Sequence, residues 1–491
     1  MLPDLNQKLT DYVARFNAED EELYIQSVDD AHALEYLVQN APLLECPDPV
    51  IERAFYFRWW TLRKHWKETA YGHILTEFLP PVPWAGPENS INCALGHHLR
   101  EARWFRDNDG WLWEYVRFWL RGHGDIMSYS TWLADSLEAV FAVRPNPSLQ
   151  EEAFPVLEAL FQKRENIAKR PCGLYWSNDD RDGMEYSISG PGIRPTLNSY
   201  MYGDACALSR MAEYLGKGDR AAYYGKKAEE IRGAIERLLW DGDFYRTIPC
   251  AEGDPADWRE RPDIPPEHRC RELVGYLPWF FHAAPPEHDG AFLQLKEKDG
   301  FAVPWGLTTA EQRHPRFLFK HEHECLWNGY VWPFATAQTL TALSTACRDR
   351  RGDFPLNGGD YLAMLRQYAA SHTITGEDGR LRMWIDEDMH PYTGRWFARD
   401  ELQRDHWNPS RGGRERGKDY NHSTFCDLVL SGLLGIHYVD GGIRARPIIT
   451  TEWPYFLVTG LTEENWTVLY DRDGSRYGMG AGLHCFRAGE G

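Results

Sequence analysis

The spacing of apolar residues predicts a mainly helical protein. From residue 50 onwards, apolar side chains recur three and four positions apart in successive runs, beginning with VIERAFYFRWWTLRKHW. This is the period of an amphipathic helix, and about twelve such runs follow Pro49. Short and long connections alternate between the runs. Long loops at every second junction predict a helical barrel with its functional residues on one face.

The two ends of the chain differ from this pattern. Residues 1–48 predict an N-terminal extension of two short amphipathic helices, and residues 49–440 are expected to form the barrel. Residues 441–491 carry β-branched and aromatic runs broken by Gly and Asn, which is typical of strands. We expect this last segment to pack on the barrel as β-structure.

Two finer expectations concern the helices. The runs at 197–216 and 219–240 predict an antiparallel helix pair, with Asp219 as the N-cap of the second helix. Residues 373–420 lack the helical period and are expected to form a loop before a last helix.

Composition limits the range of partners. With 54 Lys and Arg against 73 Asp and Glu, the net charge of −19 argues against nucleic acid as a partner. The ten cysteines are scattered without a CxxC motif, which predicts reduced thiols and a cytoplasmic protein. No signal peptide or membrane-spanning stretch is expected. We expect no cofactor, and the sequence leaves a homo-oligomer open.

The stretch 173–205 concentrates acidic and aromatic residues in a segment that glycines and prolines break into loops. Aromatic faces stack on the C–H faces of sugars, and charged groups bind their hydroxyls, so this stretch predicts a sugar site. A solvated acidic turn is the simpler alternative. A calcium loop is a second alternative, but position 12 of the EF-hand pattern holds Ser189 instead of the required Glu.

A second acidic loop, MWIDEDMHPYTGRW at 383–396, contains Asp386, Glu387 and Asp388. Hydrolysis of a glycosidic bond needs one protonated carboxyl group to protonate the leaving oxygen and one ionised group to activate water. Clustered carboxylates raise the pKa of one member, which keeps an acid protonated near neutral pH. The two acidic loops are therefore candidates to meet in one catalytic site.

Several sequence runs resemble the bacterial members of glycoside hydrolase family 63, closest to the branch of mannosylglycerate and glucosylglycerate hydrolases. The resemblance extends from Pro49 to Ile436 and implies an (α/α)6 barrel that hydrolyses an α-glycoside with inversion. The runs that carry it are YFRWW, EFLPPVPWAG, YSTWLADS, DDRDGMEYSISG, RPTLNSYMYGDA, WNGYVWPFATAQTLTAL, EDMHPYTG and GKDYNHSTFCDL.

The resemblance also implies catalytic roles. It assigns the general acid to Asp182 in DGMEYS and the base to Glu387, four residues before Pro391. Asp388 and Met389 replace the aromatic pair that usually follows the base, and Glu415 is the alternative base. An inverting pair should hold its carboxyl groups about 6.5–9.5 Å apart to admit a water molecule.

The expected ligand is a small glycoside or oligosaccharide. Further residues are expected to bind it, because they lie in these motifs or at loop–helix junctions. The basic run that contains Arg414, Arg416 and Lys418 could neutralise a carboxylate such as a glycerate on the substrate. The predicted substrate-binding residues are Arg58, Trp59, Trp84, Trp176, Arg181, Glu185, Tyr186, Arg194, Asn198, Tyr202, Trp327, Asn328, Trp332, Trp384, Arg414, Lys418, Tyr420 and His422.

Two other functions remain open on the sequence. A polysaccharide lyase could use Tyr420, Asn421 and His422 with Arg414 to act on a uronate, and a sugar-binding protein without catalysis would need neither carboxylate. His321 and His323 lie two positions apart without a matching carboxylate or Cys pattern, so no metal site is expected.

Overall fold

The structure, a computed structural model, describes residues 2–350, 354–376, 378–439, 441–487 and 489, and its described part is mainly helical. The predicted domain boundary at residue 440 lies outside the described residues. The α-helices are α1 (Asn6–Glu19), α2 (Ala33–Asn40), α3 (Pro49–Lys64), α4 (Leu95–Ala102), α5 (Trp111–Leu120), α6 (Leu133–Val143), α7 (Pro147–Ala168), α8 (Pro195–Tyr214), α9 (Gly218–Leu239), α10 (Leu277–Phe280), α11 (Pro333–Asp349), α12 (Gly358–Ser371) and α13 (Phe397–Arg404).

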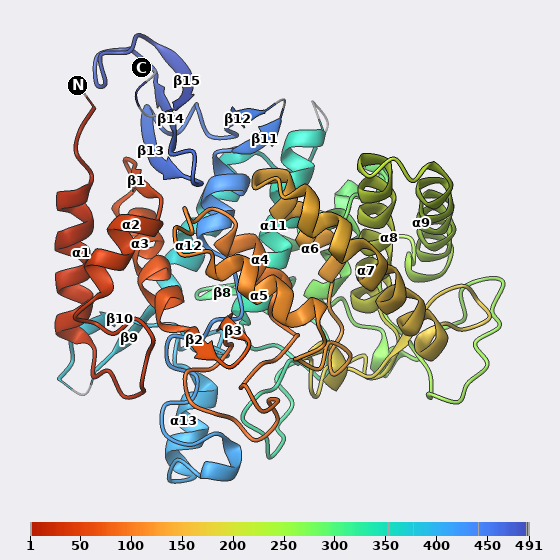
Figure 1. Cartoon of the computed structure of the whole chain (residues 1–491). Coiled ribbons are helices and arrows are strands. Elements are labelled where there is room, and N and C mark those ends of the chain that lie inside the picture. The colour runs from red at the N-terminus through yellow and green to blue at the C-terminus, as the bar shows by residue number, and fades with distance from the viewer. Residues whose placement is uncertain (1, 351–353, 377, 440, 488, 490–491) are drawn as a thin grey trace.

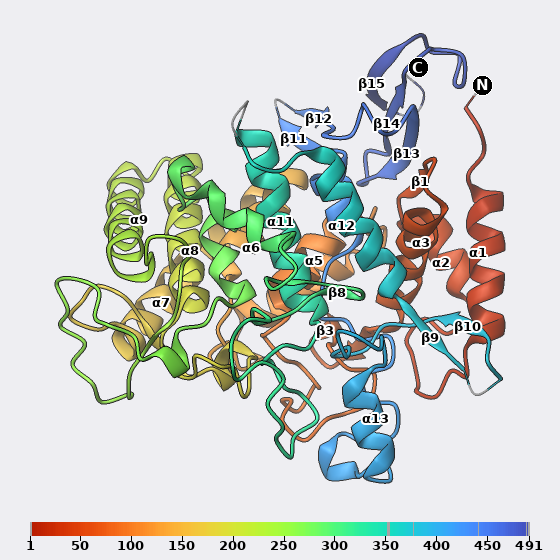
Figure 2. The same ribbon diagram turned by 180° about the vertical axis from the view of Figure 1, so that it is seen from behind.

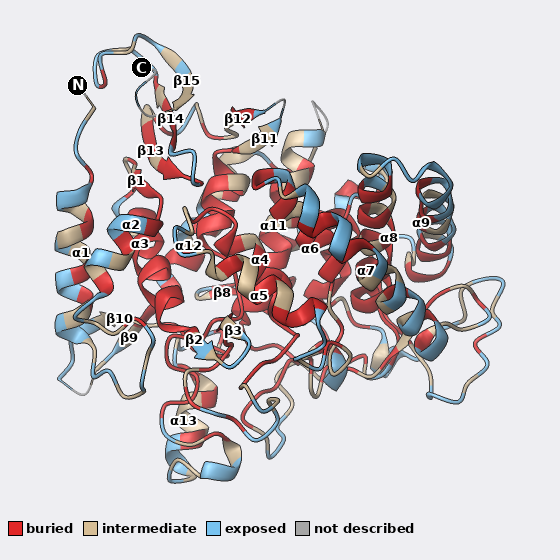
Figure 3. Ribbon diagram, viewed as in Figure 1, coloured by how far each residue is buried: buried red, intermediate tan, exposed pale blue. Residues whose placement is uncertain are grey.

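Successive helices pack side by side around a buried centre. Helix α4 contacts α6, α6 contacts α8, α8 contacts α10, and the series continues through α11 and α12 to α3. Helices α7 and α9 pack on the outside of α8. Figure 3 shows that the central helices are buried, whereas the outward faces of α7 and α9 are exposed.

The start of α3 illustrates how the sequence fixes a helix end. The Asp48 side chain accepts hydrogen bonds from the backbone N–H groups of Val50 and Ile51 at 3.0 and 3.3 Å, and Pro49 occupies the first turn. An acidic N-cap followed by proline is a preferred helix start. The helix is buried along most of its length, and it carries Arg58 and Trp59 into the core.

The C-terminal segment forms strands, as its composition predicts. An antiparallel sheet has the order β1–β13–β14–β15, and its first strand comes from the N-terminal extension, with Leu43 opposite Thr459. Figures 1 and 2 show this sheet at one end of the molecule and α13 at the opposite end, where long loops gather. The strands are β1 (Leu43–Glu45), β13 (Tyr455–Leu461), β14 (Trp466–Asp471) and β15 (Gly482–Arg487).

The remaining strands are short and belong to loops. They are β2 (Trp66–Thr69), β3 (Gly72–Leu75), β4 (Trp176–Ser177), β5 (Gly192–Ile193), β6 (Ile248–Pro249), β7 (Ala302–Val303), β8 (Gly306–Leu307), β9 (Thr373–Thr375), β10 (Leu381–Met383), β11 (His437–Val439) and β12 (Gly442–Arg444).

Two sequence expectations need correction, whereas the predicted last helix is present. Residues 373–420, expected as a loop, contain the β9–β10 hairpin and α13. Asp219 does not cap α9, because Lys217 occupies the N-cap and Asp219 lies inside the first turn. The last helical run contains a π-helix at Leu428–Leu433. Among the described helices, none has the length and apolar composition needed to cross a membrane.

Candidate active site

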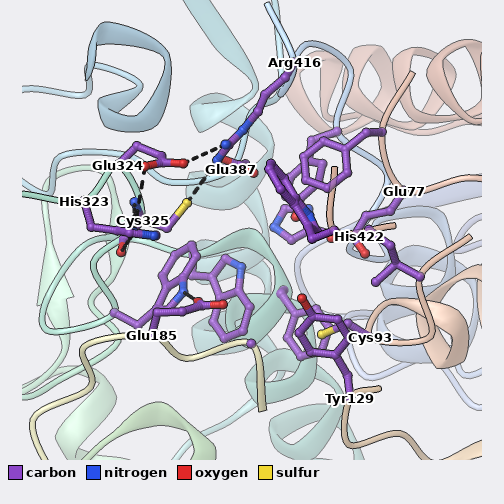
Figure 4. Close-up of a pocket in the computed structure, with 18 residues that line it drawn as sticks. Glu77, Cys93, Tyr129, Glu185, His323, Glu324, Cys325, Glu387, Arg416 and His422 are labelled. Atoms are coloured by element: carbon purple, nitrogen blue, oxygen red, sulfur yellow. Dashed lines mark hydrogen bonds and ion pairs between the residues drawn. The ribbon is translucent and has the colours of Figure 1, made fainter. Parts of the chain in front are cut away.

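Loops from distant parts of the chain enclose a cavity of about 270 Å³. We call it the carboxylate cavity, because four carboxyl groups line it together with a single arginine. Figure 4 shows these groups around a common space. The charged lining residues are Glu77, Glu185, Glu324, Glu387 and Arg416, and the aromatic ones are Phe78, Trp84, Tyr129, Trp327, Trp332, Phe334 and Tyr420.

Glu387 is held in the cavity by a guanidinium and a thiol. Arg416 Nη2 lies 2.6 Å from Glu387 Oε2, and Cys325 Sγ donates to the same oxygen at 3.2 Å. Arg416 Nη1 also binds Glu324 at 2.7 Å. Burial alone would raise the pKa of Glu324, but Arg416 and Arg411 lower it to about 2. Arg416 therefore places a positive charge directly beside the Glu387 carboxyl group.

Glu185 meets the opposite environment. The Trp327 indole N–H donates to Glu185 Oε2 at 2.8 Å, and the structure gives this carboxyl no ion pair with any described residue. Burial, assisted by the negative charges of Asp180 and Glu387, raises the pKa of Glu185 to about 7. A carboxyl group with this pKa is partly protonated at neutral pH, as a general acid requires.

The turn at Gly183 directs Glu185 into the cavity. A single 3₁₀ turn at Asp180–Asp182 ends at Gly183, whose φ of 68° lies in the left-handed region. Glycine adopts this conformation without the steric cost that a Cβ would add. A Cβ at this position would also approach Cys93 Sγ to 3.0 Å. The chain therefore reverses here, which buries Met184 and leaves Glu185 on the cavity wall.

A third carboxyl group, Glu77, lies near the other wall of the cavity. The Tyr420 hydroxyl donates to Glu77 Oε1, and Glu77 Oε2 is buried without a partner among the described residues. Burial raises the pKa of Glu77 to about 8, with a further contribution from the charge of Glu387. His422 packs on Tyr420, and both of its ring nitrogens are likewise buried without a partner.

Buried neighbours fix the loop that carries Glu387. Asp386 accepts a hydrogen bond from the Glu387 backbone N–H at 2.9 Å and from the Trp384 indole at 3.1 Å. Asp388 accepts from the Ala398 N–H in the first turn of α13 at 2.8 Å, and Met389 is bridged to Val331. The residues that depart from the usual family motif thus anchor the loop in this chain.

Asp182, which the sequence predicts as the acid, does not line the cavity. One carboxylate oxygen accepts from Ser130 Oγ at 2.6 Å and Ser177 Oγ at 2.8 Å. The other accepts from Arg194 Nε at 2.6 Å, and both side chains of this ion pair are fully buried. Both oxygens of this buried carboxylate are already hydrogen-bonded within the protein, so its surroundings favour a structural role.

Four predicted residues belong to the core or to loop scaffolding around it. Arg58 donates to backbone oxygens of the 420–423 segment, and Trp59 is completely buried. Asn198 pairs with the Tyr175 backbone. Tyr202 is buried in the hydrophobic core.

Four more predicted residues do not line the cavity. The Trp176 indole donates to the Cys250 carbonyl at 2.9 Å, and Arg181 donates to the Ser128 carbonyl at 3.1 Å. The Asn328 amide donates to the Phe319 carbonyl. Tyr186 packs against His321 and His323, so it stands next to the wall instead of forming it.

Four further predicted residues line a second cavity of about 850 Å³, between the N-terminal extension and the β9–β10 hairpin. These are Trp384, Arg414, Lys418 and the alternative base Glu415. Arg399 binds both oxygens of the Glu415 carboxylate, at 2.5 and 2.7 Å. Glu415 therefore lies in the second cavity, apart from the four carboxyl groups that line the carboxylate cavity.

Seven predicted residues do line the carboxylate cavity: Trp84, Glu185, Trp327, Trp332, Glu387, Tyr420 and His422. Three residues of this lining were not predicted as site residues: Glu77, Glu324 and Cys325. Arg416 was predicted only as part of the basic run. Glu77 opens the run EFLPPVPWAG, so its position in a matched motif was the signal available for it. Within the described residues, no cluster of His, Cys, Asp and Glu could hold a metal ion.

Comparison with known proteins identifies related folds. Residues 87–423 match the mannosylglycerate hydrolase MGH1-like glycoside hydrolase domain. The structure resembles a sialidase with 34% identity and a TM-score of 0.87, over 98% of this chain. The chain spans only 43% of the length of that sialidase. None of the curated proteins matches the sequence.

Two more distant structures are similar in fold alone. One is the GH63 mannosylglycerate hydrolase from Thermus thermophilus in complex with Tris and D-glycerate, at 12% identity and a TM-score of 0.52, over 77% of this chain and 100% of that one. The other is the α-L-rhamnosidase of Streptomyces avermitilis complexed with L-rhamnose, also at 12% identity and a TM-score of 0.52, over 88% of this chain and 36% of that one.

Proposed function

Because this chain belongs to the family of mannosylglycerate hydrolase MGH1-like glycoside hydrolases, we propose that it hydrolyses the α-glycosidic bond of a small glycoside with inversion. Glu185 is the general acid in this proposal, and Glu387 is the base. Asp182, the acid expected from the sequence, instead becomes a positioning residue that fixes the loop through Arg194.

The contrast between the two carboxyl groups carries the proposal. Both line one cavity, yet Glu387 is paired with Arg416, whereas Glu185 accepts a hydrogen bond from an indole. Environments that push two carboxyl groups toward opposite protonation states separate an acid from a base. Figure 4 draws Glu387 beside Arg416 and Glu185 apart from both.

Hydrolysis then follows from the two protonation states. Glu185 gives its proton to the glycosidic oxygen while the bond from that oxygen to the anomeric carbon breaks. Glu387 takes a proton from a water molecule, and the water oxygen forms the new bond on the opposite face of the sugar. Trp327 and Trp332, whose rings stack 4.3 Å apart on the wall, offer an aromatic surface to the sugar ring.

We also propose a barrel architecture and a cytoplasmic location for this protein. The series of helix contacts from α4 round to α3 supports an (α/α)6 barrel over residues 49–440, preceded by the extension at 1–48 and followed by the β segment. The cysteines are free thiols, which is typical of a reducing compartment and supports the predicted cytoplasmic location. Sugars remain the expected ligands, and a homo-oligomer remains open.

Hydrolysis of a panel of α-glucosides, α-mannosides, α-galactosides and α-rhamnosides tests the function. We expect at least one sugar to be released, with the β-anomer detected by proton NMR before mutarotation. An α-anomer as the first product would contradict inversion. An unsaturated product that absorbs ultraviolet light would identify a lyase instead.

A further inference from the structure

The charges on the wall of the carboxylate cavity do not balance. Four carboxyl groups line it, and Arg416 is the single lysine or arginine among the described lining residues. Both terminal nitrogens of its guanidinium are already occupied, because they donate to Glu387, to Glu324 and to the Arg411 carbonyl. No lysine or arginine of this described wall is left to pair with a negatively charged ligand.

The histidines of the cavity do not supply that charge. Burial, with the added effect of His97, lowers the pKa of His422 well below its usual value, so this ring is neutral. His323 Nδ1 lies 4.0 Å from Glu324. His323 thus already stands beside one of the acids of the cavity, and its Nδ1 also contacts the Cys325 backbone oxygen at 2.9 Å.

Apart from Arg416, the cations predicted to bind a substrate carboxylate lie outside the carboxylate cavity. Arg414 Nη2 is 3.4 Å from Glu21, and Lys418 is paired with Asp20. Both residues line the second cavity and not the carboxylate cavity. Arg414 and Lys418 are therefore paired with acids of the N-terminal extension.

Unpaired polar atoms show what the cavity can bind instead. Glu77 Oε2 and both ring nitrogens of His422 are buried without a partner in the described part of the chain, and buried polar groups are normally hydrogen-bonded. A hydroxyl group can donate and accept, whereas a carboxylate can only accept. The volume of about 270 Å³ lies just below the usual range for ligand pockets, about 300–1,000 Å³, and suits a sugar with a small aglycone.

From the occupied arginine and these unpaired atoms, we infer that the cavity selects a neutral, polyhydroxylated glycoside and rejects one whose aglycone carries a carboxylate, such as a glycerate. This inference rests on the proposed hydrolase function and names its substrate class. The discrimination is electrostatic, because an incoming carboxylate would face Glu324 and Glu387 without a free counter-charge.

Matched substrates test the inference. Each sugar of the panel is supplied as its glycerol and its glycerate conjugate, which differ by one carboxylate at nearly constant size. We expect kcat/KM to be at least about tenfold higher for the glycerol conjugate of the sugar that is cleaved. Raising NaCl should increase kcat/KM for the glycerate conjugate and leave the glycerol value nearly constant, since salt screens charge repulsion.

A pair of variants isolates the role of charge. Trp84 lies at the rim, is 40% exposed and packs against Arg416. Trp84→Lys replaces the ring with a cation, whereas Trp84→Met only removes the ring. The ratio of kcat/KM for the glycerol conjugate to that for the glycerate conjugate should therefore be smaller in the lysine variant than in the methionine variant. Proton NMR spectra of the two variants verify that both are folded.

The outcomes separate the inference from the proposed function. Equal or faster hydrolysis of the glycerate conjugate by the wild-type enzyme would overturn the inference and leave the hydrolase function intact. Identical discrimination by the two Trp84 variants would also overturn it. Absence of hydrolysis for every conjugate and every simple glycoside of the panel would instead refute the hydrolase function.

Discussion

Arg416 joins Glu387 to Glu324 through the two terminal nitrogens of one guanidinium, at 2.6 and 2.7 Å. Its buried Nε has no partner among the described residues, and its Cζ lies 4.9 Å from the ring centre of Trp84. The orientation of the proposed base therefore depends on a planar group that binds two carboxylates at once. A point charge on a flexible chain would not reproduce this arrangement.

Arg416→Lys should accordingly lower kcat by about 10²-fold, because an ammonium group cannot hold both carboxylates in the same geometry. Arg399→Lys is the control, since Arg399 also binds with two of its nitrogens, in its case to both oxygens of Glu415 outside the carboxylate cavity. Steady-state kinetics of both variants check this. Equal losses in the two variants would argue against the special role of Arg416.

Glu387→Gln should abolish nearly all turnover, since an amide cannot accept the proton of the attacking water. Glu415→Gln is the control, because it removes a buried, arginine-paired carboxylate that does not line the carboxylate cavity. We expect the Glu415 variant to keep most of its activity. The opposite result in kinetic assays would transfer the role of base to Glu415.

Activity should fall as the pH rises above about 7. Glu185 must be protonated to act as an acid, and burial raises its pKa to about 7, so the fraction of competent enzyme declines through that pH. A pH profile of kcat/KM on an alkyl glycoside measures this. A rate that stays constant up to about pH 9 would contradict the assignment of Glu185.

Stability should show a related dependence through Glu77. Its pKa is raised from 4.5 to about 8 in the folded protein, so the folded state binds the proton more tightly than the unfolded state. The stabilisation is complete below about pH 4.5 and is lost as the pH rises to about 8, at up to roughly 1.4 kcal/mol per pH unit.

Glu77→Gln should therefore reduce the slope of the unfolding free energy against pH over this window, as measured by urea denaturation at several pH values. Glu322→Gln changes an exposed glutamate and should leave the slope unaltered. A wild-type protein that becomes more stable between about pH 5 and 8, with the Glu77 variant parallel to it, would refute this account.

Asp182→Asn should act mainly on stability. The substitution leaves the fully buried Arg194 without its counter-charge, which costs about 3–5 kcal/mol in comparable buried pairs. Asp180→Asn, two residues earlier and exposed, is the control and should change the unfolding free energy by less than about 0.5 kcal/mol. Chemical denaturation compares the two variants, and an unchanged stability of Asp182→Asn would contradict the structural role.

The sequence predicts the helices well because their apolar period reports directly on burial. Helix α3 begins where Pro49 and Asp48 indicate, and the C-terminal strands follow from β-branched composition. Helix α13 was missed because its eight residues, Phe397–Arg404, bury only Ala398 and Leu402. Such a short helix shows too little of the period to stand out from a polar loop.

The site could be predicted only in part, because side-chain direction is a tertiary property. Asp182 and Glu185 lie in the same acidic loop, and the left-handed turn at Gly183 decides which one reaches the cavity. Glu77 acquires its surroundings from Tyr420, 343 positions away. No local pattern records that contact, whereas the loop motif around Glu387 was sufficient to identify it as a candidate.

The leaving-group dependence of Glu185→Gln tests the central claim most directly. General acid help is worth about 10²–10⁴-fold, and it matters most when the leaving oxygen is basic. We predict that the variant loses about 10³-fold in kcat/KM on an alkyl glycoside and far less on a dinitrophenyl glycoside of the same sugar. Asp182→Asn, compared per folded molecule, should lower both rates by the same factor. The account would be contradicted if Glu185→Gln lowered kcat/KM by the same factor on both glycosides while Asp182→Asn lowered it on the alkyl glycoside and not on the dinitrophenyl glycoside.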